Sequence, residues 1–125
     1  MPEAAQQSLF AVITKQPGIV HARLIGPTIG AREVPIITDL VAPAIEKSAG
    51  GELRWVVLDM SSVTFVNSMG LGMCIDFRNR AHKAGAKTIL YGMNQQLTDL
   101  FKMVKVDRLF TILKDGNDAA KVVAS

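Results

Sequence analysis

The 125-residue sequence contains a single cysteine and only two histidines. Cys74 has no partner for a disulfide within the chain, and His21 and His82 are too widely spaced to join it in a metal-binding motif. These absences argue against redox and metal chemistry. We therefore expect neither a metal ion nor a cofactor.

Long apolar runs are also missing. No uninterrupted apolar stretch reaches the roughly 18 residues that a membrane-spanning helix needs. The first four residues, Met1 to Ala4, have neither the basic region nor the apolar region of a signal peptide. We expect a cytoplasmic protein with no direct membrane insertion.

Clustered positive charge is absent too, although the net charge is +3. The 14 lysines and arginines are interspersed with 11 acidic residues. The chain has few aromatic residues, namely one tryptophan, one tyrosine and five phenylalanines. Nucleic-acid-binding proteins gather basic residues on one face and add aromatic rings that stack on bases. We expect no nucleic acid among the partners.

The first part of the chain predicts a loose tail, a hairpin and a helix. A hydrophobic content of 49% is enough for one core, so we expect a tail at 1–8 and a single domain at 9–125. Apolar or alternating runs at 9–14 and 19–25 flank residues 15–18, which contain a Pro-Gly turn. Helical spacing then predicts a helix over 31–48. Because proline lacks an N–H and clashes with the preceding turn, we expect a kink or an early end at Pro43.

The second part alternates strands with helices. Residues 55–58 form an apolar run ended by Asp59, which is typical of a strand buried on both faces. The further predicted elements are a helix at 68–84, a strand at 87–91, a helix capped by Asn94, a strand at 109–113 and a helix at 117–123. Strands separated by helices lie parallel. The sequence therefore predicts an α/β fold, with about four helices and a mixed, mostly parallel sheet of about five strands whose first strand is the antiparallel edge.

One segment carries the functional signal. A strand ending Leu58-Asp59 is followed, after a loop, by a helix that opens with the residues Asn67-Ser68-Met69-Gly70-Leu71-Gly72. This arrangement resembles the STAS domain, the family of anti-sigma factor antagonists and of the cytoplasmic domains of sulfate transporters, and the resemblance covers nearly the whole chain. It implies a single STAS-like domain in which Ser68 matches the serine that is phosphorylated in the antagonists. The partner-binding residues that it implies are Asp59, Asn67, Ser68, Met69, Gly70, Leu71 and Gly72.

The resemblance implies a protein-binding switch and not an enzyme. The expected partners are an anti-sigma factor that is also a serine kinase of histidine-kinase-like ATPase fold, and a serine phosphatase that restores the unmodified state. Two departures from the family pattern leave an alternative open, since Asn67 replaces the usual aspartate and Met69 the second serine. The alternative is an unphosphorylated STAS scaffold or a transporter-accessory subunit.

The residues around Ser68 suit a phosphate on physical grounds. In the first turn of a helix, backbone N–H groups lack helical partners and the macrodipole favours negative charge by ~0.5–1 kcal/mol. Gly70 and Gly72 have no side chains, so we expect that a partner's backbone can approach this turn closely. For Asp59 two roles stay open, a local one capping the loop near Ser61 and one in partner contact.

An esterase-like nucleophile is the enzymatic alternative, because residues 66–70 resemble the strand-turn-helix elbow G-x-S-x-G. Val66 replaces the first glycine, and a nucleophilic serine needs a base within hydrogen-bond reach. His82 is expected about 21 Å along the same helix from Ser68, and His21 is expected on the hairpin. No base is therefore expected beside Ser68.

Overall fold

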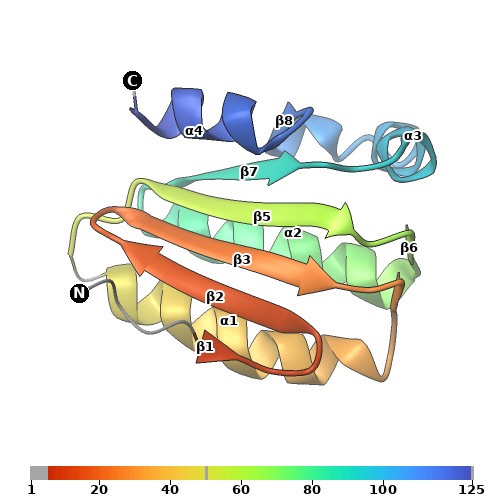
Figure 1. Ribbon diagram of the computed structural model, residues 1–125, viewed down its shortest axis with the longest axis horizontal. Helices are drawn as coiled ribbons and strands as arrows, with labels where there is room; N and C mark the ends of the chain where they lie inside the picture. The colour runs from red at the N-terminus through yellow and green to blue at the C-terminus, as the bar shows by residue number, and fades with distance from the viewer. Residues whose placement is uncertain (1–5, 50, 125) are drawn as a thin grey trace.

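The computed structural model describes residues 6–49 and 51–124. It confirms an α/β fold with one central mixed sheet, whose strands follow the order β1-β2-β3-β5-β7-β8 (Figure 1). The elements are β1 (Gln6–Gln7), β2 (Ala11–Gln16), β3 (Ile19–Ile25), β4 (Thr28–Ile29), α1 (Glu33–Ala49), β5 (Trp55–Ser62), β6 (Phe65–Val66), α2 (Ser68–Lys83), β7 (Lys87–Tyr91), α3 (Gln95–Met103), the 3-10 helix η1 (Asp107–Leu109), β8 (Thr111–Leu113) and α4 (Gly116–Ala124).

The sheet has the predicted directions. Strand β2 pairs antiparallel with β3, whereas β3–β5, β5–β7 and β7–β8 pair parallel through helical crossovers. The hairpin turn is tighter than predicted. Gln16 pairs directly with Ile19, so only Pro17 and Gly18 form the turn, and Gly18 takes the positive φ of 78° that glycine permits.

The predicted tail at 1–8 is partly structured. Gln6 and Gln7 form β1 and pair antiparallel with Ile13 and Val12, so β1 and not β2 is the edge strand. Residues 1–5 of the predicted tail lie outside the described residues.

Helix α1 runs through Pro43, so the early end expected there is wrong. Ile37, Val41 and Ile45 are fully buried on the helix face that packs on the hairpin strands. Burial of such side chains contributes about 1.5–3 kcal/mol each, which outweighs the roughly 3 kcal/mol penalty of one internal proline.

The two faces of the sheet are covered differently. One face carries Leu24, Leu58 and Leu90 into the main core beneath α1 and α2, which lie together behind the strands (Figure 1). The opposite face carries Val57 and Ile89 into a small second core. Among the helices, α4 supplies the buried residue of that second core and packs on β5, β7 and β8.

Two strand boundaries differ clearly from the predicted ones. Strand β5 continues through Asp59 to Ser62, and the predicted strand at 109–113 is reduced to β8, because Leu109 is the last residue of the 3-10 helix η1. A second, two-stranded sheet of β4 and β6 was not predicted, because two-residue strands leave no periodic pattern. In the described ranges 6–49 and 51–124, no helix has the length and apolar character to cross a membrane.

Candidate partner-binding site at the start of helix α2

Helix α2 begins at Ser68, directly after a capping asparagine. The Asn67 side-chain oxygen accepts hydrogen bonds from the backbone N–H groups of Met69, at 3.0 Å, and Gly70, at 3.1 Å. Its backbone is extended, with φ −87° and ψ −172°. Asn67 thus satisfies two of the N–H groups that a helix start leaves unpaired.

The small β4–β6 sheet fixes where this helix starts. Parallel pairing sets Ile29 beside Val66, and the Asn67 N–H donates to the Ile29 carbonyl oxygen at 3.2 Å. Val66 and Ile29 are both fully buried. The start of α2 is therefore held by backbone bonds and apolar packing on its inner side, while its outer side remains exposed.

Ser68 lies on that exposed outer side. Two apolar side chains accompany it, because Phe65 is 40% exposed and Met69 is 48% exposed. The first turn of α2 contains no acidic residue. The result is an exposed hydroxyl at the positive end of a helix dipole, with two exposed apolar residues within three positions of it in sequence, a combination that suits both protein contact and a phosphate.

The two glycines of the motif have different roles, which corrects the expectation that both leave the turn bare for a partner. Gly70 is buried, and a Cβ atom there would lie 2.5 Å from the Ile29 carbonyl oxygen. Gly72 is exposed and has open space where its Cβ would be. Gly70 therefore serves internal packing, and only Gly72 leaves the outer surface open. Leu71 is half-buried against the main core.

Asp59 performs the local capping role that was one of its two predicted alternatives. It is 7% exposed, and its Oδ1 atom accepts hydrogen bonds from the Ser61 N–H at 2.9 Å and the Ser61 hydroxyl at 2.5 Å. These bonds hold the end of β5 before the loop that leads to β6. Because its carboxylate is buried and bonded to Ser61, Asp59 does not contribute to the exposed surface around Ser68.

The candidate bases and nucleophiles lie apart from this surface. His82 is near the opposite end of α2 from Ser68, and His21 is on β3. Cys74 is fully buried, and burial raises the pKa of its thiol to about 12, so it stays protonated and inert. Among the described residues, no group of three histidine, cysteine or acidic side chains could hold a metal ion.

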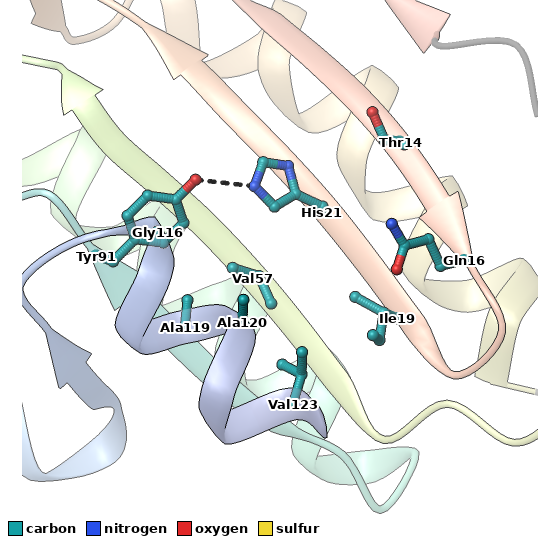
Figure 2. A pocket seen from close by; sticks show the side chains of 10 residues that line it. All are labelled: Thr14, Gln16, Ile19, His21, Val57, Tyr91, Gly116, Ala119, Ala120 and Val123. Atoms are coloured by element: carbon teal, nitrogen blue, oxygen red, sulfur yellow. Dashed lines mark hydrogen bonds between the residues drawn. The ribbon is translucent and has the colours of Figure 1, made fainter. Parts of the chain in front are cut away.

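A second polar group was missed by the sequence analysis. The Nε2 atom of His21 and the hydroxyl of Tyr91 form a 3.0 Å hydrogen bond on the sheet face that carries α4 (Figure 2). Burial lowers the pKa of His21, against an opposing effect of the Asp59 carboxylate. Burial also raises the pKa of Tyr91 to about 12, with the Asp59 charge as a further cause. Both rings are therefore neutral near pH 7. The signal in the sequence was the period-two placement of Ile19 and His21, which puts both on one face of β3.

Comparison with known proteins identifies the domain. A sequence model of the STAS domain matches residues 11–119. An anti-sigma factor antagonist from Mycobacterium paratuberculosis has a similar structure, with 16% identity, a TM-score of 0.74 and coverage of 92% of this chain and 93% of that one. The Bacillus cell fate determinant SpoIIAA in its phosphorylated form matches at 17% identity and a TM-score of 0.67, covering 95% of this chain and 99% of that one.

The same fold also occurs inside a much larger protein. The murine anion transporter Slc26a9 matches with 20% identity and a TM-score of 0.70, over 87% of this chain but 18% of the transporter. At such identities these likenesses show the fold alone.

Proposed function

The chain belongs to the STAS domain family, and from that membership we propose that it is an anti-sigma factor antagonist whose switch is phosphorylation of Ser68. Unphosphorylated, it binds an anti-sigma factor that is also a serine kinase of histidine-kinase-like ATPase fold, and this binding releases the sigma factor. Phosphorylation weakens the complex, and a serine phosphatase restores it. The chain itself is a binding protein, not an enzyme.

The observation that carries the proposal is the exposure of Ser68 as the first residue of α2. A kinase must reach the hydroxyl without unfolding the domain, and an exposed side chain at a helix start permits this. The capping bonds of Asn67 go to Met69 and Gly70, so they do not occupy the Ser68 hydroxyl.

The apolar neighbours support a docking role for the same surface. Phe65 and Met69 are both exposed beside Ser68, and aromatic and methionine side chains are enriched in protein interfaces. Gly72 adds a position without a side chain, where a partner can approach the helix closely. The proposed contact surface therefore consists of Phe65, Asn67, Ser68, Met69, Leu71 and Gly72.

The proposed switch depends on the negative charge that a phosphate adds at the start of α2. It adds about −1.5 to −2 charges and three strong acceptors at the positive end of α2, where negative charge is favourable. The domain therefore stays folded. When a partner covers the same surface, the phosphate must lose its hydration beside apolar side chains, and each ~1.4 kcal/mol of that cost weakens binding tenfold.

A scaffold or transporter-accessory role is the competing function. The occurrence of a STAS fold within Slc26a9 supports it, as does the absence of an acidic residue in the first turn of α2. In this role Ser68 is only a helix-start residue and carries no phosphate.

Phosphorylation by candidate kinases separates the two functions. The purified protein is incubated with ATP and each anti-sigma factor kinase of histidine-kinase-like fold from the source organism, and the intact mass is measured. We expect one added phosphate, which disappears in Ser68→Ala and persists in Ser61→Ala and Ser62→Ala. A phosphate mapped to another residue contradicts the assignment of Ser68, and no phosphate with any of these kinases favours the scaffold.

A further inference from the structure

A hollow of about 300 Å³ lies between the sheet and helix α4 (Figure 2). Its walls come from β2, β3, β5 and the end of β7 on the sheet side and from α4 on the other. None of residues 65–72 lines it, so it is distinct from the surface around Ser68. Pockets that bind small molecules begin at about this volume.

Small residues on α4 are the reason that the hollow exists. Gly116, Ala119 and Ala120 line it, so the helix backbone passes over the sheet with little side-chain volume beneath it. Across from them, Ile19 and Val57 contribute two apolar side chains to the sheet side of the hollow. An occupant would bury an apolar body between these two walls.

Polar groups gather along the sheet side of the hollow. Thr14 pairs in register with His21, and Gln16 lies one pleat further along β2, so all three project from the same face. His21 is engaged with Tyr91. Within the part of the chain that the structure describes, neither the Thr14 hydroxyl nor the Gln16 amide has a side-chain hydrogen-bond partner. Two hydrogen-bonding groups are therefore free to contact an occupant.

Among the described residues, none that lines the hollow carries a charged side chain. Asp59 and Arg23 both influence the pKa values of His21 and Tyr91, but they are paired in register on β5 and β3 and are not part of the lining. A charged occupant would lose hydration without gaining an opposite charge from the walls, and this costs several kcal/mol.

We propose that this hollow is a binding site for a neutral small molecule with an apolar body of about two fused rings and one hydroxyl or N–H group at its edge. The apolar body lies between Val57 and the alanines of α4, and the polar group bonds Thr14 or Gln16. This site is independent of the proposed phospho-switch, since it uses none of the same residues.

Titration with 2-naphthol tests the site, with 2-naphthoate as a probe of matched shape that carries a charge. Binding is measured by calorimetry and by amide chemical shifts in ¹⁵N-labelled protein. We expect saturable one-to-one binding of 2-naphthol with shifts at Ala119, Ala120 and His21, and binding of 2-naphthoate weaker by about tenfold or more. No saturable binding of 2-naphthol up to its solubility limit, or equal binding of the two probes, overturns the proposal.

Two substitutions on α4 test whether 2-naphthol binds in this hollow. Ala120 is exposed at the mouth of the hollow, so Ala120→Leu fills the space without burying a strained side chain, and we expect it to raise the Kd by about tenfold. Ala124→Leu makes the same change on the same helix outside the lining, and should leave the Kd within about twofold. Equal affinity of Ala120→Leu and the wild type overturns the assignment to this hollow.

Discussion

Gly70 packs against the carbonyl oxygen of Ile29 so closely that a Cβ atom on Gly70 would lie 2.5 Å from it. The Ile29 carbonyl oxygen accepts a hydrogen bond from the Asn67 N–H, and the Gly70 N–H donates to the Asn67 side chain, so neither group can move away easily. We expect Gly70→Ala to lower the free energy of unfolding by ~1–3 kcal/mol, the usual cost of overpacking. Chemical denaturation measures this.

Gly72→Ala is the matched control, because it lies two residues further along α2 with open space around its Cβ position. There alanine gains up to ~1 kcal/mol from its higher helix propensity. The two variants should therefore shift stability in opposite directions. Equal shifts would contradict the different roles assigned to the two glycines.

Thr88 presents a buried hydroxyl without a bond. It is 2% exposed on β7, and its Oγ1 atom has no hydrogen-bond partner among the described residues. Because an unpaired buried polar group is unfavourable, Thr88→Val should raise the free energy of unfolding by ~1 kcal/mol. Thr98→Val is the control, since the Thr98 hydroxyl donates to the Asn94 carbonyl and its removal should lower stability. A destabilised Thr88→Val would mean that the hydroxyl is bonded in solution.

His21 should make stability depend on pH. Burial lowers its pKa from the usual 6.5, so below that pH the unfolded chain takes up this proton more readily than the folded one. The free energy of unfolding should therefore fall as the pH drops from about 7 to about 5. Denaturation curves at several pH values should show a shallower fall in His21→Phe. His82→Gln, which changes an exposed histidine and keeps His21, should retain the wild-type slope.

Strong periodic patterns predicted most of the fold. The apolar run at Trp55 to Leu58 predicted the central strand. The stripe of Leu97, Leu100, Phe101 and Val104 predicted α3. Its first three residues pack in the main core, whereas Val104 follows the last helical residue and is 43% exposed. The pattern could not locate the β4–β6 pair, because each strand has only two residues and the two strands are far apart in sequence. It also predicted a kink or an early end at Pro43, and the early end does not occur because tertiary packing outweighs the local penalty.

The candidate site was predicted in part for the same reason. The motif located the start of α2 and the cap at Asn67, which are local features of sequence. Whether Gly70 faces inward and Gly72 outward depends on Ile29, which lies far away in sequence. The hollow beside His21 and Tyr91 is formed by four strands and α4 together, so no short segment of the sequence could predict it.

Asn67→Asp tests whether the missing carboxylate matters. Both residues cap a helix start equally well, so the free energy of unfolding should stay within ~0.5 kcal/mol of the wild type. If a kinase uses an acidic residue beside the serine, the rate of phosphorylation should rise, and this is measured with a kinase that modifies the wild-type protein in the assay described above. Asn67→Ala removes the acceptor of two backbone bonds and should cost ~1 kcal/mol. An unchanged rate in Asn67→Asp would show that the carboxylate has no part in recognition.

Ser68→Asp separates an interface effect from unfolding. A carboxylate in the first turn of α2 is favoured by the dipole, so a thermal melt should show stability close to the wild type. Partner binding, measured by calorimetric titration, should weaken by about tenfold or more, because the charge must lose its hydration against the partner. An aspartate carries less charge and fewer acceptors than a phosphate, so the phosphorylated protein should bind more weakly still.

Ser68→Asn is the control, because asparagine has nearly the same shape as aspartate but carries no charge. It should bind the partner almost normally, as should Ser68→Ala. Equal weakening by Asn and Asp would assign the effect to size rather than charge, and full binding by the phosphorylated protein would contradict the switch.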